Sequence, residues 1–104
     1  MARLAFKMRL YKGLEDEYRK RHDELWPELA QLLKDTGISN YSIFLDPSTN
    51  DLFGVLDAAD PAALDALPSK PIMKKWWTYM KDLMETNPDH SPVSLPLKEV
   101  FYLP

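Results

Sequence analysis

Large apolar residues alternate with polar or small ones at the start of the chain, and the pattern changes to helical spacing after Gly13. In residues 3–11 (RLAFKMRLY), every second residue from Leu4 to Leu10 is large and apolar, which predicts a half-buried strand. From about Leu14 onward, apolar residues recur at helical spacing, which predicts helix, and Gly37 is expected to cap its end. Pro27 lies inside this helical stretch and lacks the amide proton that a helix interior needs. We therefore expect two short helices, with the break near residues 23–26 and Pro27 as the first residue of the second.

The middle of the chain predicts a β-hairpin followed by a second helical region. Two apolar runs, residues 40–45 (NYSIFL) and 52–58 (LFGVLDA), flank the turn-forming residues 46–51 (DPSTND). Residues 61–67 then predict a short helical turn, bounded by prolines. Helical spacing resumes over residues 72–86 (IMKKWWTYMKDLMET), and the Asn-Pro pair that follows would end that helix.

The chain ends with another alternating segment, residues 97–103 (LKEVFYL), which predicts a last strand after a proline-rich loop. The predicted order is β-α-β-β-α-β, the ferredoxin-like pattern of an α+β fold: an antiparallel sheet with its helices on one face. At 104 residues, the chain (residues 1–104) is expected to be a single domain. Because the other face of such a sheet is bare, we expect a homodimer, packed sheet to sheet or with joined edges, in a dimeric α/β barrel-type assembly.

Composition and charge exclude several classes of function. The net charge is -3 and the pI is about 5.3, so no basic face for binding nucleic acid is expected. The sequence has no cysteine, so disulfides, thiolate metal sites and thiol nucleophiles are excluded, and no clustered histidine and carboxylate pattern suggests a metal site. No apolar run approaches the length of a membrane span, and the N-terminal residues lack the apolar region of a signal peptide. We therefore expect a cytoplasmic protein that binds neither nucleic acid nor membrane.

Histidine is the side chain whose ordinary pKa best suits acid and base catalysis near neutral pH, and the chain has two. His22 lies four residues after Tyr18 and four before Trp26, so the three side chains form an aromatic stripe on one face of the predicted helix. The stripe runs into the Pro27 break, which makes His22 the first catalytic candidate, although a surface histidine without a task fits the same spacing. His90, in the proline-framed loop NPDHSP, is the weaker candidate, because isolated loop histidines are usually only solvated.

Three further aromatic residues are candidates for a binding pocket. Trp76 and Trp77 are adjacent, so on a helix their side chains point about 100° apart. One could belong to the core and the other to a pocket wall, but burial of both in the core or in a dimer interface fits as well. Tyr41 begins the second predicted strand, where an ordinary strand aromatic would also be expected.

Five segments together resemble the L-rhamnose mutarotase family: EYRKRHDELWPEL, NYSIFLD, KWWTYM, NPDHSPVS and EVFYLP. The resemblance covers essentially the whole chain and keeps the order of the motifs. It implies a dimeric protein of ferredoxin-like fold. It also implies an enzyme that interconverts the α and β anomers of L-rhamnose without a metal or another cofactor. It also implies that His22 is the proton donor and that four residues bind the sugar: Tyr18, Tyr41, Trp76 and Trp77.

Two positions depart from the family pattern. Lys20 precedes Arg21 where a pair of arginines is expected, and this exchange should be harmless. His90 stands where asparagine is expected, which bears on the fine geometry of the pocket and argues against His90 as a general catalyst of the family.

The chemistry of mutarotation suits these residue types. Opening the hemiacetal ring needs a proton delivered to the ring oxygen and one removed from the anomeric hydroxyl, and a histidine can donate on opening and accept on closure. Aromatic rings pack against the apolar C–H faces of a sugar and against the C6 methyl group of rhamnose, while tyrosine hydroxyls can hydrogen-bond to its hydroxyl groups.

Two alternatives stay open at this point. Small dimeric α+β barrel proteins also include cofactor-independent monooxygenases and haem-degrading enzymes, which haem or a quinol substrate would reveal by a spectral change or by oxygen uptake. A non-enzymatic sugar-binding module is the other alternative. In such a module, His22→Ala would leave sugar binding nearly intact and there would be no activity to lose.

Overall fold

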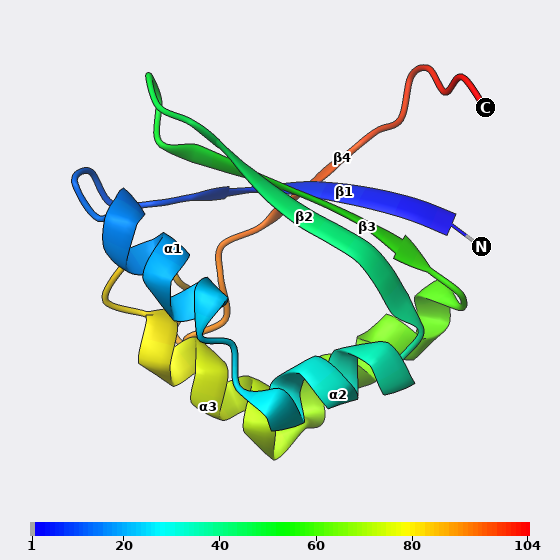
Figure 1. The fold of residues 1–104 in the computed structure, drawn as a ribbon, viewed down its shortest axis with the longest axis horizontal. Coiled ribbons are helices and arrows are strands. Elements are labelled where there is room, and N and C mark those ends of the chain that lie inside the picture. Colours follow the sequence, from blue (N-terminus) through cyan, green and yellow to red (C-terminus); the bar gives the residue numbers. More distant parts are fainter. Residues whose placement is uncertain (1) are drawn as a thin grey trace.

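The computed structural model describes residues 2–104, whose four strands form one antiparallel sheet in the order β2-β3-β1-β4 (Figure 1). β1 (Ala2–Arg9) is the alternating segment at the start of the chain, and it pairs with both β3 and β4. β2 (Ile38–Asp46) and β3 (Asp51–Ala58) form the predicted hairpin. β4 (Leu95–Leu97) is the edge strand on the side opposite β2.

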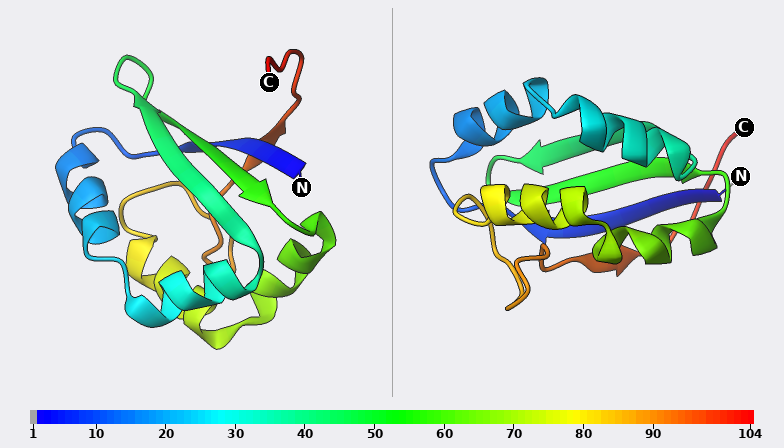
Figure 2. Two further views of the ribbon diagram at one scale, coloured as in Figure 1. Left: turned by 45° about the vertical axis from the view of Figure 1, so that its right-hand side comes forward. Right: turned by 90° about the horizontal axis from the view of Figure 1, so that it is seen from below.

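Two rows of helices lie side by side on one face of the sheet (Figure 2). α1 (Glu15–Asp23) and α2 (Pro27–Asp35) form the first row. The 3-10 helix η1 (Pro61–Ser69) and α3 (Pro71–Met80) form the second. None of the helices in residues 2–104 combines the length and the apolar character that a membrane crossing requires.

The break between α1 and α2 falls where the sequence predicts it. Pro27 is the first residue of α2, a position where its missing amide proton costs no helical hydrogen bond. Gly37 follows α2 with a φ of +94°, and its amide donates to the carbonyl oxygen of Lys34 (3.0 Å), as expected of a helix cap. His22 consequently lies in the last turn of α1, directly before the break.

The core lies between the helices and the sheet. Leu29 of α2 and Leu52 of β3 are its most completely buried large side chains, and burying one leucine stabilises the fold by roughly 1.5–3 kcal/mol. The larger of two core clusters consists of Met8, Leu10, Tyr18, Leu29, Leu52, Trp76, Met80, Leu83 and Met84. Two of the candidate site residues, Tyr18 and Trp76, therefore belong to the same cluster as these leucines. The candidate site is therefore anchored in the packed interior.

The last helix is shorter than its pattern predicts. Helical spacing continues over residues 72–86, but α3 ends at Met80. The backbone beyond that point turns and pairs with the residues that follow β1, where the Tyr11 amide donates to the Leu83 carbonyl oxygen (2.9 Å). Such contacts between distant parts of the chain supply hydrogen bonds that the predicted helix would have made locally.

The prediction of a strand over residues 97–103 is wrong. Strand structure ends at Leu97, and the C-terminal tail, residues 98–104, extends away from the sheet in irregular conformation (Figure 1). Its apolar side chains are exposed, with 89% of Val100 accessible to solvent. Alternation predicts a strand only where something covers the apolar side, and within residues 2–104 these side chains find no such cover.

Candidate functional site

A cavity of about 1160 Å³ lies between the helices and the sheet, and all five predicted site residues border it. α1 contributes Tyr18 and His22, β2 contributes Tyr41, and α3 contributes Trp76 and Trp77. A recess of about 80 Å³ shares these five residues as walls. The fold therefore brings together the five side chains, from three separate elements, to which the resemblance gives a role in one site.

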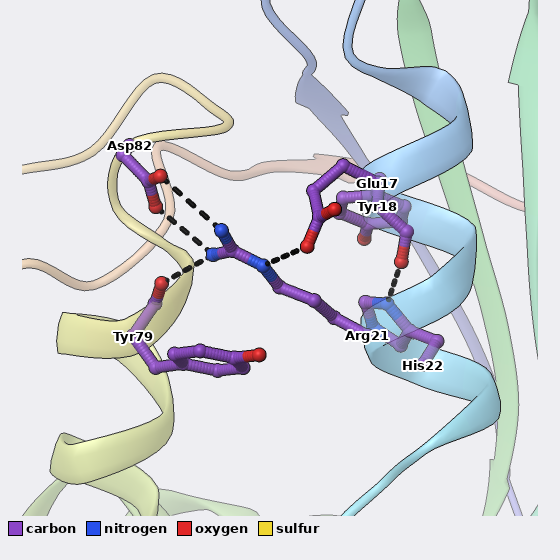
Figure 3. A network of polar contacts seen from close by, with 6 residues as sticks. All are labelled: Glu17, Tyr18, Arg21, His22, Tyr79 and Asp82. Carbon is purple, nitrogen blue, oxygen red and sulfur yellow. Dashed lines mark hydrogen bonds and ion pairs between the residues drawn. The ribbon is translucent and has the colours of Figure 1, made fainter.

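His22 is held through one of its two ring nitrogens. Nδ1 lies 3.0 Å from the carbonyl oxygen of Tyr18, one helical turn earlier (Figure 3). Because a carbonyl oxygen only accepts hydrogen bonds, Nδ1 carries the proton, and the neutral ring keeps its lone pair on Nε2. Burial lowers the pKa of His22 below its ordinary value, more than the Tyr18 carbonyl and the Asp23 carboxylate raise it. The imidazole is consequently neutral near pH 7.

Aromatic rings fix the plane of the His22 ring. The ring of Tyr18 lies 4.4 Å away between centroids, and the ring of Trp76 meets it edge to face at 5.5 Å. Burial raises the pKa of the Tyr18 hydroxyl far above its ordinary value, and the nearby Tyr41 adds to this effect. The Tyr18 hydroxyl therefore stays neutral and able to donate a hydrogen bond.

Tyr41 approaches the same space from the sheet. Its ring meets that of Phe6, in β1, edge to face at 6.1 Å between centroids. Although 39% of Tyr41 is exposed, desolvation raises the pKa of its hydroxyl to about 12. Phe6 in turn lies against Gly54 of β3, where an added Cβ would collide with the Phe6 ring. Phe6 thus forms part of the floor beneath Tyr41.

The paired tryptophans differ in burial. Trp76 is buried in the core cluster, whereas Trp77 is half-buried, and both border the cavity. Trp26, which the sequence aligns with Tyr18 and His22, packs edge to face on Trp76 at 5.1 Å and lies 5.5 Å from Tyr79. It therefore supports the wall of the cavity from behind.

His90 borders the small recess together with His22, although sequence reasoning ranked it well below His22. Its backbone has a φ of +71°, and its Nδ1 lies 3.3 Å from the hydroxyl oxygen of Thr78. The Thr78 hydroxyl donates its proton to the carbonyl oxygen of Lys74 (3.0 Å), so in the contact with His90 the imidazole is the donor. His90 is thus a polar group in the loop wall of the recess.

Arg21, which sequence reasoning did not single out, joins α1 to the end of α3 (Figure 3). Its Nη1 and Nη2 donate to the two carboxylate oxygens of Asp82 (3.0 and 3.3 Å). Nη1 also donates to the backbone carbonyl oxygen of Tyr79 (2.6 Å), and Nε donates to Glu17 (2.8 Å). The guanidinium lies 4.4 Å from the centre of the Tyr79 ring. Only the spacing of Glu17 and Arg21 could have been read from the sequence.

The arrangement suits proton transfer to an uncharged ligand with apolar faces. A neutral histidine offers one lone pair, two neutral phenols offer hydrogen bonds, and indole rings provide apolar walls. Among residues 2–104, no three histidine, aspartate or glutamate side chains converge in a way that could hold a metal ion.

Comparisons with known proteins agree with this chemistry. Residues 3–103 match the family model described as L-rhamnose mutarotase. The chain is 56% identical to the L-rhamnose mutarotase of Brucella anthropi over 102 residues, which are 98% of this chain and 96% of the relative. It is 55% identical to that of Formosa agariphila over 103 residues, 99% of each chain. The crystal structure of L-rhamnose mutarotase from Formosa agariphila matches the fold with a TM-score of 0.93, at 54% identity and complete coverage of both chains.

Proposed function

The chain belongs to the L-rhamnose mutarotase family, and we propose that it interconverts the α and β anomers of L-rhamnose by acid and base opening and closure of the sugar ring. The observation that carries the mechanism is the hydrogen bond from His22 Nδ1 to the Tyr18 carbonyl oxygen. It commits one ring nitrogen to the helix and leaves Nε2 as the nitrogen that exchanges protons with a ligand.

His22 is the proton donor in this proposal. Protonated at Nε2, it gives that proton to the ring oxygen of the sugar while the bond between this oxygen and the anomeric carbon breaks. The anomeric oxygen becomes the aldehyde oxygen and releases its proton to water. After rotation about the bond between C1 and C2, these transfers run in reverse and close the ring on the other face. The lowered pKa of His22 makes its protonated form a readier donor.

Four aromatic residues bind the sugar in this proposal. Trp76 and Trp77 cover its apolar C–H surface and its methyl group, because both indoles border the cavity. The hydroxyl groups of Tyr18 and Tyr41 hydrogen-bond to sugar hydroxyls that would otherwise lose their water partners on burial. Both phenols keep their protons near pH 7, so each can donate a hydrogen bond as well as accept one.

We also propose that the fold is ferredoxin-like and that the protein is a cytoplasmic homodimer. The strand order β2-β3-β1-β4, with every pairing antiparallel and the helices on one face, supports the ferredoxin-like topology. Exposed apolar residues on two strands and in the C-terminal tail support the dimer, among them Phe44, Leu95, Leu97, Val100, Phe101 and Leu103. The cytoplasmic location stays a prediction from the sequence.

The activity can be tested by saturation-transfer proton NMR, which measures exchange between the anomers of L-rhamnose at equilibrium. We expect the native protein to accelerate exchange, and His22→Ala to lose most of this acceleration while keeping its fold and sugar binding. His90→Asn is the matched control, because it changes the other histidine to the residue expected in the family, and it should keep the acceleration. No acceleration by the native protein would refute the proposed function. Full activity in folded His22→Ala would refute the role of His22.

A further inference from the structure

β2 contains a bulge directly before Tyr41. Ser39 pairs with Asp57 of β3, but the next pair is Ser42 with Val55. Two residues of β2, Asn40 and Tyr41, therefore stand opposite one residue of β3. This extra residue changes which positions of β2 face the helices.

The face that Tyr41 occupies depends on the bulge. Ile38, three residues earlier, is buried in the core beneath the helices. In a regular strand, residues three apart point to opposite faces, so Tyr41 would lie on the face without helices. It instead borders the cavity, and Ile43 beyond it packs against the core. The bulge thus brings Tyr41 to the same face as Ile38.

Asn40 is the residue whose backbone makes this possible. Its φ is +50°, in the left-handed region that costs most residues about 1–2 kcal/mol and that asparagine tolerates better. Its side-chain Nδ2 donates to Oδ2 of Asp57 (3.0 Å). Oδ1 of Asp57 accepts from Nε of Arg3 (3.3 Å), and Asp57 is only 7% exposed. The Asn40 side chain is therefore tied to a carboxylate that the neighbouring strands hold in place.

We propose that Asn40 and Asp57 are positioning residues that set Tyr41 in the cavity through the left-handed bulge. Neither needs to touch the sugar, because their effect is transmitted by the face to which Tyr41 points. The consequence for catalysis rests on the proposed function, in which the Tyr41 hydroxyl binds the sugar. The effect on the position of the Tyr41 ring does not depend on it.

The first test compares two substitutions at Asn40. Asn40→Ala loses the hydrogen bond and strains the left-handed backbone, whereas Asn40→Gly loses the hydrogen bond alone. We expect Asn40→Ala to raise KM for anomer exchange roughly two- to tenfold, the range for one hydrogen bond. It should change kcat less, and Asn40→Gly should restore part of the loss. The proposal is wrong if Asn40→Ala leaves KM unchanged or lowers kcat alone.

Asn50→Ala is the matched control. Asn50 also has a left-handed backbone, with a φ of +63°, but it lies in the turn between β2 and β3. A general loss of stability from removing a left-handed asparagine should occur in both variants, whereas the rise in KM should occur only at Asn40. Equal rises in KM would show that the effect of Asn40 is merely structural.

Asp57 is tested separately. Asp57→Asn keeps an oxygen that can accept from Asn40 and should leave KM near the native value. Asp57→Ala removes that acceptor and should raise KM as Asn40→Gly does. Equal KM values for Asp57→Ala and the native protein would remove Asp57 from the proposal.

A double-mutant cycle asks whether Asn40 acts through Tyr41. Tyr41→Phe removes the hydroxyl that the bulge positions. In that background, Asn40→Ala should raise KM by much less than in the native protein, since residues that act on one contact are not additive. Fully additive effects on KM would contradict the proposal.

A measurement without sugar separates this proposal from the proposed function. NMR cross-relaxation between the ring protons of Tyr41 and Phe6 reports directly on the position of Tyr41. We expect these signals in the native protein and their weakening or loss in Asn40→Ala, whether or not L-rhamnose is the substrate. Unchanged signals in folded Asn40→Ala would overturn the proposal even if the enzyme is a mutarotase.

Discussion

At the scale of single residues, the orientation of His22 comes from the helix that carries it. The hydrogen bond of one ring nitrogen, made to a carboxylate or a backbone carbonyl, decides which nitrogen of a histidine holds the proton. Here the carbonyl oxygen of Tyr18 does so from one turn earlier. The sequence shows that the two residues share a helical face, but it does not show the side-chain rotamer on which this hydrogen bond depends.

The buried His22 should make the fold more sensitive to acid. Its pKa is lowered in the folded state, so between that value and the ordinary value of about 6.5 the unfolded chain binds more protons. The free energy of unfolding is therefore unaffected by His22 above about pH 6.5, and it decreases as the pH falls below this value toward the folded pKa. Urea unfolding at pH 7.5 and pH 5 should show a larger loss for the native protein than for His22→Ala. Equal losses would contradict the burial of a neutral His22.

The Tyr18 hydroxyl can be removed without removing its ring. Tyr18→Phe keeps the contact of that ring with His22, so we expect a normal fold, kcat close to native and a rise in KM of roughly two- to tenfold for one lost hydrogen bond. Steady-state analysis of anomer exchange would measure both parameters. A large fall in kcat at unchanged KM would instead indicate that Tyr18 relays a proton.

At the scale of elements, Arg21 connects α1 with the end of α3. Its donation to the Tyr79 carbonyl oxygen satisfies a helix-terminal acceptor, while its bidentate contact with Asp82 fixes the turn that follows α3. His22 follows Arg21 on α1, so we expect the contacts that hold α1 against the end of α3 to support the packing of His22 against Trp76.

Loss of the Arg21 contacts should loosen the candidate site. We expect Arg21→Ala to lower the free energy of unfolding by about 1–2 kcal/mol, a modest value because Asp82 is largely exposed. Anomer exchange should slow as well, and Arg21→Lys should recover little because lysine cannot form the bidentate contact. Arg19→Ala is the control on the same helix, since the Arg19 pair with Asp23 (4.0 Å) is exposed. Equal stability of Arg19→Ala and Arg21→Ala would refute this role.

Elements defined by local signals were predicted from the sequence, and those defined by distant contacts were not. Pro27 and Gly37 determine where α2 begins and ends through their own backbone properties, and both predictions are confirmed. The end of α3 depends instead on contacts with Arg21 and Tyr11, which sequence spacing does not show. The bulge could have been predicted from the sequence, because Ile38 and Tyr41 are three residues apart and a strict alternation of β2 would place them on opposite faces.

The candidate site follows the same division. Residue types and spacing selected His22 and Tyr18 and made Tyr41, Trp76 and Trp77 pocket candidates, and the resemblance added the sugar-binding roles. All five border one cavity. The assignment to the L-rhamnose mutarotase family is confirmed, whereas the role of each residue stays a prediction. The positions of supporting groups, such as Arg21, depend on the packing of elements far apart in the sequence.

At the scale of the whole molecule, the sheet face opposite the helices carries apolar groups in contact with water. Phe44 of β2 lies between Ile43 and Leu45, which pack against the core, so its side chain points to the other face and is 62% exposed. Leu95 and Leu97 of β4 are exposed as well. The C-terminal tail adds further apolar side chains beyond β4. Burying such groups against a second copy would stabilise a dimer by roughly 25 cal/mol for each Å² of apolar surface removed from water, before the cost of association is subtracted.

Sedimentation velocity can test the proposed dimer. We expect the native protein to sediment as a dimer. Phe44→Asp should shift it toward monomer, because the dimer would bury the new charge against the second copy. Tyr11→Asp is the control, because Tyr11 is exposed but follows β1 outside the sheet, and this variant should stay dimeric. A monomeric native protein would exclude the dimer. Dimers unaffected by Phe44→Asp would place the interface elsewhere.

The contact between Phe6 and Gly54 gives protein engineering a way to alter the cavity from below. A Cβ at position 54 would collide with the Phe6 ring, so side chains at positions 6 and 54 compete for the same space. Bulk removed at Phe6 deepens the floor of the cavity, and bulk added at Gly54 fills the space again. The size of the accepted sugar could thus be selected with a pair of coupled positions in the sheet, without changing any residue proposed to bind the substrate.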